Sequence, residues 1–203
     1  MKNFVVGIDL GSRAVKGTLI DTSKKKLVAR SFADAGTNPK CVAESIYSDL
    51  LEKARITKCD VGFVTTTGYG RYSPDFSDKI ATEITCHALG VKTLIPDVKT
   101  IIDIGGQDSK AIFLDDHGQI KDFIMNDRCA AGTGRFFEVV SKILETDSHG
   151  IAELAMKAGN QTEISSMCVV FAESEVIGLL AKDTPREDIA AEFMLQLQEE
   201  LQV

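Results

Sequence analysis

The sequence predicts an α/β protein made of two related lobes. Short runs of Val, Ile, Leu and Phe bounded by polar turns are typical of strands, and longer stretches carry apolar residues at helical spacing. A glycine-containing strand–turn–strand unit occurs twice, with its aspartates 94 residues apart. The chain has 203 residues, which is enough for two lobes that each bury a core.

The expected elements follow a similar order in the two lobes. In the first lobe we expect a meander of three strands, a helix, a strand and a second helix, at residues 4–9, 15–21, 26–33, 40–54, 60–66 and 75–89. In the second lobe we expect the meander again and then four helices, at residues 99–104, 109–114, 119–125, 133–145, 150–158, 171–182 and 186–201. Pro96 and Asp97 mark the boundary, so the lobes should span residues 1–96 and 97–203.

The repeated unit fits a hairpin whose first strand ends in aspartate. Asp9 and Asp103 are each followed by glycine two residues later and by lysine seven residues later. Glycine lets backbone N–H groups approach phosphate oxygens, and an aspartate at a strand end can hold Mg²⁺ through water. One such hairpin is more often a plain turn, but two copies favour a phosphate clamped between lobes. The absence of a Gly-x4-Gly-Lys-Ser/Thr segment excludes a P-loop enzyme.

Two cysteines precede predicted helices. Cys129 comes shortly before the helical stretch that starts near Thr133, and Cys168 comes shortly before the one that starts at Phe171. The positive end of a helix dipole stabilises a thiolate, which suits a cysteine to hold a metal cluster or to react. A buried structural thiol beside a tight turn is the alternative. The remaining cysteines, Cys41, Cys59 and Cys86, are expected to be structural or incidental.

Composition and charge exclude several classes of function. The net charge is −7 and basic residues are scattered, which argues against nucleic acid as a partner. The cluster Lys24–Lys26 is interpreted as a solvated turn. No run approaches the roughly 20 apolar residues of a membrane span, and the first residues lack a signal-peptide pattern. Five cysteines without paired spacing favour free thiols or metal ligands over disulfides, so we expect a cytoplasmic protein.

Five motifs together resemble one family. They are Thr67–Arg71, Glu83–Ala88, Asp103–Lys110, Met125–Phe136 and Ser166–Glu175. The hairpins look like the two phosphate loops of the actin, Hsp70 and sugar-kinase superfamily. The motifs as a set are similar to the ATP-dependent activators of 2-hydroxyacyl-CoA dehydratases, which belong with the BadF/BadG/BcrA/BcrD-type ATPases and are relatives of the benzoyl-CoA reductase ATPase subunits.

The resemblance implies an actin/Hsp70/sugar-kinase-like two-lobe fold of duplicated ribonuclease-H-like units. It also implies ATP-driven transfer of one electron from a ferredoxin or flavodoxin to a partner 2-hydroxyacyl-CoA dehydratase or a related CoA-ester reductase. By the same resemblance, Cys129 and Cys168 bind a [4Fe–4S] cluster. Because such a cube needs four thiolates, two per chain imply one cluster shared by a homodimer.

The resemblance further implies that ATP and Mg²⁺ bind between the hairpins. Asp9 and Asp103 would position Mg²⁺ and water, and Gln107, or else Asp108, would orient the attacking water. Phosphate contacts are expected from Gly11, Ser12, Arg13 and Lys16 in the first lobe and from Gly105, Gly106 and Gln107 in the second.

The chain departs from the family pattern at its end. It stops before the family's Gly-Gly adenosine-binding segment and closing helices, so we expect the second lobe to be truncated relative to the family. Two alternatives stay open. One is a small-molecule kinase of the same superfamily, and the other is an inactive nucleotide-binding or interaction module.

Overall fold

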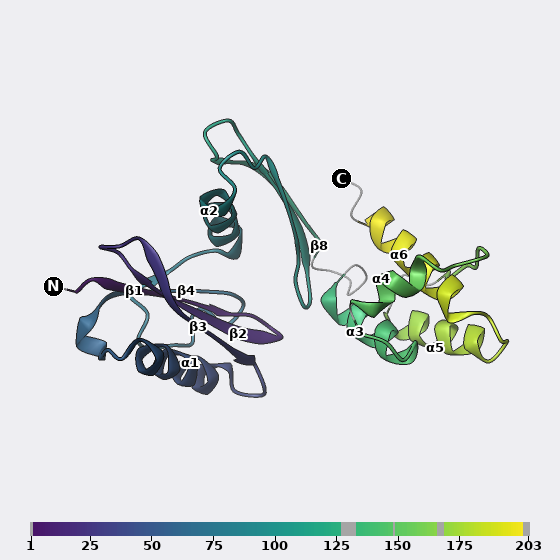
Figure 1. Ribbon diagram of the computed structural model, residues 1–203, viewed down its shortest axis with the longest axis horizontal. Coiled ribbons are helices and arrows are strands. Elements are labelled where there is room, and N and C mark those ends of the chain that lie inside the picture. The colour runs from purple at the N-terminus through teal and green to yellow at the C-terminus, as the bar shows by residue number, and fades with distance from the viewer. Residues whose placement is uncertain (1, 127–132, 148, 166–168, 201–203) are drawn as a thin grey trace. The chain divides into compact units, whose positions relative to one another are not determined.

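The computed structural model describes residues 2–126, 133–147, 149–165 and 169–200. These residues form a mixed α/β structure that divides into two compact units, Met1–Val98 and Lys99–Val203, each described by itself (Figure 1). The division into nucleotide-binding lobes at residues 96 and 97 stays a prediction. In the described part of the chain, no helix combines the length and apolar character needed to cross a membrane.

The first unit is built on a five-stranded sheet in the order β3-β2-β1-β4-β5. The first three strands form the predicted antiparallel meander, while β4 runs parallel to β1 and β5 runs parallel to β4. The strands are β1 (Phe4–Leu10), β2 (Ala14–Asp21), β3 (Lys26–Asp34), β4 (Val61–Thr67) and β5 (Lys79–Ile80), and the helices are α1 (Pro39–Ala54), η1 (Lys58–Asp60) and α2 (Glu83–Leu94). Lys24 and Lys25 lie in the turn between β2 and β3, as predicted, and Lys26 begins β3.

Helix α1 packs against β2 and β3 and closes the core of the first unit (Figure 1). Alternate residues of β2 are buried, including Val15 and Leu19, because strand side chains point to opposite faces in turn. Gly17 lies between these two residues, where a Cβ atom would come within 2.5 Å of Ile46 Cγ2 and 2.9 Å of Leu50 Cδ1. The glycine therefore lets α1 approach the sheet closely.

The helix predicted at residues 75–89 is wrong in its first half. The backbone N–H of Asp78 donates to Val64 O at 2.9 Å, and the Asp78 carboxylate accepts from Val64 N at 2.8 Å. Phe76 stacks on Tyr47 of α1, with ring centroids 5.0 Å apart. These contacts with β4 and α1 hold the segment extended beside the sheet. The helix begins only after Thr82, whose side chain accepts a hydrogen bond from Thr85 N at 3.2 Å.

The second unit contains a three-stranded antiparallel sheet and four helices. The strands are β6 (Thr100–Ile104), β7 (Ser109–Leu114) and β8 (Ile120–Asn126), in the order β6-β7-β8. The helices are α3 (Gly134–Ile143), α4 (Gly150–Ala155), α5 (Val169–Leu180) and α6 (Arg186–Glu200). All seven elements occur where the sequence predicts them, with ends that differ by up to three residues. The helices share a buried core that includes Val140, Ile151, Val176 and Phe193.

Candidate functional site

The two predicted hairpins have the same cross-strand pairing. Asp9 lies opposite Lys16 in the β1–β2 pair, and Asp103 lies opposite Lys110 in the β6–β7 pair. Residues opposite each other in antiparallel strands present their side chains on the same face. The seven-residue spacing read from the sequence is therefore the spacing that brings each lysine against its aspartate.

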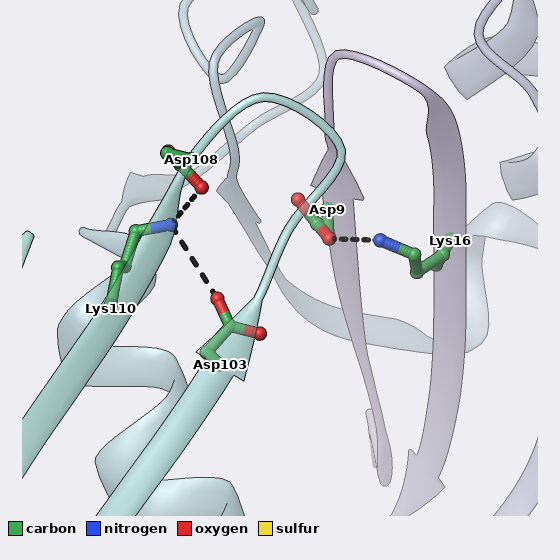
Figure 2. Close-up of polar contacts among 5 residues, drawn as sticks. All are labelled: Asp9, Lys16, Asp103, Asp108 and Lys110. Carbon is green, nitrogen blue, oxygen red and sulfur yellow. Dashed lines mark hydrogen bonds and ion pairs between the residues drawn. The ribbon is translucent and has the colours of Figure 1, made fainter. Parts of the chain in front are cut away.

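The lysine of each hairpin contacts carboxylates of its own hairpin, as Figure 2 shows. Lys16 Nζ donates to Asp9 Oδ2 at 3.0 Å. Lys110 Nζ lies 2.6 Å from Asp108 Oδ1 and 3.5 Å from Asp103 Oδ2. The Lys16 side chain is 59% exposed, whereas that of Lys110 is only 3% exposed. Lys16 thus presents its ammonium group to solvent, while Lys110 neutralises two carboxylates inside its unit.

Each turn has a glycine where a side chain would collide with the backbone. A Cβ atom on Gly11 would lie 2.9 Å from Ala14 O, and one on Gly105 would lie 3.0 Å from Asp108 O. Gly105 N also donates to Asp108 O at 2.8 Å, which closes the second turn. Bare backbone at these positions is what close approach of a phosphate requires.

The remaining predicted phosphate contacts lie on the same two turns. Ser12 and Arg13 are exposed on the first turn. Gln107 is exposed on the second turn, beside the half-buried Gly106. Each turn therefore brings together its own set of predicted residues. The pairing of Asp108 with the buried Lys110 favours a structural role for Asp108 and leaves Gln107 as the better candidate to orient water.

The loop after β4 contributes to the first hairpin in a way that the sequence did not predict. Gly68 has a φ angle of +90°, and a Cβ atom there would lie 2.5 Å from Asp9 Oδ1 and from Leu10 O. Gly70 N donates to Leu10 O at 2.9 Å. The backbone of this loop therefore covers the end of β1 next to Asp9. The available signal was the glycine that directly follows β4 in the Thr67–Arg71 motif.

One carboxylate oxygen of Asp9 forms no hydrogen bond with the described residues. Oδ2 accepts from Lys16, but Oδ1 is buried and has no hydrogen-bond partner among the residues described. A buried carboxylate oxygen without a partner is costly, so it fits a site for a cation or its bound water. Within the described ranges, no three His, Cys, Asp or Glu residues cluster as a metal site. Mg²⁺ is usually held by one or two carboxylates, water and substrate phosphates.

The second turn is bonded directly to helix α3. Gly134 N donates to Gly105 O at 2.8 Å, and Arg135 N donates to Gly106 O at 3.2 Å. The first N–H groups of a helix have no partner within the helix, so the carbonyl groups of this turn satisfy two of them. A Cβ atom on Gly134 would lie 3.1 Å from Gly105 O, which explains the small residue at the helix start. A displacement of Gly105 or Gly106 would therefore also displace the first residues of α3.

Comparison with known proteins decides the family. Residues 6–202 match the BadF/BadG/BcrA/BcrD ATPase family. The chain belongs to the BadF/BadG/BcrA/BcrD ATPase family. The (R)-2-hydroxyglutaryl-CoA dehydratase activating ATPase of Acidaminococcus fermentans is 46% identical over 192 residues, which cover 94% of this chain and 73% of the relative. The 2-hydroxyisocaproyl-CoA dehydratase activator of Clostridioides difficile is 43% identical over 191 residues, which cover 93% of this chain and 70% of the relative.

A solved structure from this ATPase family confirms the predicted fold class. The activator of 2-hydroxyisocaproyl-CoA dehydratase from Clostridium difficile, with bound ADPNP, superimposes with a TM-score of 0.87 at 40% identity. The match covers 97% of this chain and 73% of that chain. The protein therefore has the α/β, actin-like ATPase fold, and its two glycine turns are the phosphate-binding candidates of a BadF/BadG/BcrA/BcrD ATPase.

The two cysteines predicted to bind a cluster, Cys129 and Cys168, lie outside the described residues. In the sequence, Cys129 comes five residues before the first residue of α3, and Cys168 comes directly before the first residue of α5. Their ligand role in this ATPase stays a prediction. The other three cysteines are free thiols, with Cys41 and Cys59 exposed and Cys86 half-buried.

Proposed function

We propose that this protein is the ATP-dependent activator of a 2-hydroxyacyl-CoA dehydratase or a related CoA-ester reductase, to which it delivers one electron at low potential. Membership of the ATPase family and the names of the similar activators support this proposal. The electron donor would be a ferredoxin or flavodoxin. The actin-like fold supports nucleotide binding at the two glycine turns, because bare backbone and strand-end carboxylates are the groups that bind phosphate and Mg²⁺.

The proposed nucleotide site uses the residues of the two hairpins in distinct ways. Gly11, Ser12 and Arg13 would bind phosphate oxygens through the first turn, and Lys16 would add its exposed ammonium group. Gly105, Gly106 and Gln107 would bind phosphate from the second turn, with the Gln107 side chain orienting the water that attacks the γ-phosphate. Asp9 and Asp103 would hold Mg²⁺ through water, since each lies at the end of its first strand.

The proposed electron carrier is a [4Fe–4S] cluster held by Cys129 and Cys168 from each of two chains. The donor set fits, because two thiolates per chain provide the four that such a cluster requires only in a homodimer. When bound, the cluster would store the single electron that the partner enzyme receives. Helix N-termini next to the ligands would favour this anionic group.

One observation carries the proposed link between ATP and electron transfer. In the turn that would bind phosphate, Gly105 O and Gly106 O accept hydrogen bonds from the first N–H groups of α3. The chain leading into α3 contains Cys129 five residues earlier. A change in this turn on ATP binding or hydrolysis would shift the start of α3, and with it the chain next to Cys129. This direct bonding supports a mechanical connection between the two sites.

The proposal is tested by iron, sulfide and mass analysis of protein purified without oxygen. We expect a dimer with about two iron atoms per chain, and Cys129→Ala should lose the iron while keeping the helical content of the wild type. Cys59→Ala is the matched control, because Cys59 is an exposed thiol of the first unit. A monomer without iron after anaerobic reconstitution, or full iron content in Cys129→Ala, would overturn the proposed cluster.

A further inference from the structure

Two buried oxygen atoms lie at the same edge of the first sheet. Asp9 of β1 and Thr67 of β4 are register partners in a parallel strand pair, and Thr67 is the last residue of its strand. Asp9 Oδ1 and Thr67 Oγ1 are both buried, and the described residues offer neither atom a hydrogen bond. The carboxyl ends of strands are where α/β proteins bind ligands. We therefore look for one ligand group that would bond to both oxygen atoms.

The two side chains stand on the same face of the sheet. Residues aligned on adjacent strands project in the same direction, and neighbouring strands lie roughly 4.8 Å apart. The hydroxyl of Thr67 and the carboxylate of Asp9 therefore lie at neighbouring positions on one face of the sheet without bonding to each other. A further group that hydrogen-bonds to both oxygen atoms would satisfy them.

The neighbouring residue of β4 shows that an unbonded threonine is not the rule in this strand. Thr66 points to the opposite face, where its Oγ1 donates to Arg71 O at 2.9 Å and lies 2.7 Å from Ser77 Oγ. Thr66 is thus a satisfied core residue. Thr67 instead lies beside Asp9 on the adjacent strand, and a Cβ atom on Gly68 would come within 2.5 Å of Asp9 Oδ1.

We propose that Thr67 is a binding residue of the nucleotide site and that its hydroxyl, together with Asp9 Oδ1, holds one water molecule of the Mg²⁺ bound to the nucleotide. This inference rests on the proposed ATPase function. The water binds Mg²⁺ through its oxygen, so it donates one hydrogen to Asp9 Oδ1 and the other to Thr67 Oγ1. Both oxygen atoms can accept a hydrogen bond from one water molecule, and Mg²⁺ usually keeps several waters when it binds.

The protein without ligand should tolerate loss of the Thr67 hydroxyl. Thr67→Val replaces a hydroxyl by a methyl group of similar size and removes a buried polar atom that lacks a protein partner. We therefore expect a melting temperature equal to or above that of the wild type. A hydroxyl with a structural role would give the opposite result, because its loss would leave a partner unsatisfied.

The test is calorimetric titration of the full-length protein with ADP, once with Mg²⁺ and once with EDTA. We expect the ratio of the two affinities to fall about tenfold in Thr67→Val and to be kept largely in Thr67→Ser, which retains the hydroxyl. Thr65→Val is the matched control, since Thr65 lies on the same face of β4 two residues earlier and pairs with Gly7 instead of Asp9.

The outcomes separate this inference from the function on which it rests. If wild-type protein binds ADP more tightly with Mg²⁺ and Thr67→Val keeps the full ratio, the role of Thr67 is refuted while the nucleotide site stands. A lowered melting temperature of Thr67→Val without ligand also refutes it, in favour of a structural hydroxyl. If the wild type binds no ADP under either condition, the proposed ATPase function itself fails.

Discussion

Replacement of Gly68 by alanine should damage both stability and nucleotide binding. Gly68 has a φ angle of +90°, and an added Cβ atom would lie 2.5 Å from Leu10 C, from Leu10 O and from Asp9 Oδ1. Two of these three atoms belong to the backbone of β1, so no side-chain rotation relieves the overlap. The loop or the strand end has to move, and Asp9 moves with it.

The expected loss of folding stability in Gly68→Ala is the sum of two contributions. A side chain at positive φ costs about 1–2 kcal/mol, and forcing extra atoms into a packed site costs about 1–3 kcal/mol. The sum of about 2–5 kcal/mol corresponds to a fall in melting temperature of about 5–15 °C for a chain of this size. Binding of Mg-ADP should weaken as well, because the Cβ atom displaces the Asp9 oxygen proposed to hold the metal's water.

Alanine substitutions at two other glycines separate the two contributions. Their melting temperatures are compared with that of Gly68→Ala by thermal unfolding, followed by circular dichroism. Gly36 has a φ angle of +57° with no atom within 4 Å of an added Cβ, so Gly36→Ala should cost only about 1 kcal/mol. Gly90 lies inside α2 with open space around it, and Gly90→Ala should stabilise by up to about 1 kcal/mol. If Gly68→Ala melts no lower than Gly36→Ala and binds Mg-ADP normally, the argument for close packing of Gly68 against Asp9 is refuted.

Further predictions concern the charged side chains. Lys110→Met should lower the free energy of unfolding in urea by about 3 kcal/mol, because two carboxylates lose the buried ammonium group that neutralises them. Lys16→Met should cost about 0–1 kcal/mol, because its ion pair is exposed. Equal losses in the two variants would contradict the different burial of the lysines. Backbone N–H groups of Asn160 and Gly159 hold the pKa of the buried Asp188 carboxyl below its usual range. The folded state therefore binds fewer protons there than the unfolded state, so this stabilisation is complete above about pH 4 and is lost as the pH falls through the lowered pKa. Asp188→Asn should reduce stability at pH 7 and match the wild type in strong acid, and a constant gap across that range would refute the assignment.

Local patterns in the sequence predicted most of the fold. The spacing from Asp9 to Lys16, and from Asp103 to Lys110, predicts hairpins whose pairing the structure confirms, because both strands of a hairpin are encoded within a few residues. The helix expected at residues 75–89 failed for the opposite reason. Its first half is held by Val64 of β4, and a contact of that kind leaves no local trace in the sequence.

The same limit applies to the candidate site. The residues of each phosphate turn were found because they are close in the sequence. The partnership of Asp9 with Thr67 was missed, since these residues are 58 positions apart and meet only through parallel pairing of β1 and β4. The bonding of Gly105 to Gly134 was missed likewise, and the different burial of Lys16 and Lys110 depends on what packs around each hairpin.

We propose that nucleotide at the glycine turns changes the surroundings of a cluster held by Cys129 and Cys168. The most direct test is the visible absorption spectrum of the anaerobically reconstituted dimer before and after saturation with Mg-ATP. We predict an iron–sulfur absorption band that shifts on addition of Mg-ATP in the wild type and stays unchanged in Gly11→Val, which blocks the first turn. A cluster spectrum that Mg-ATP leaves unaltered in the wild type, despite nucleotide binding shown by calorimetry, would contradict the claim.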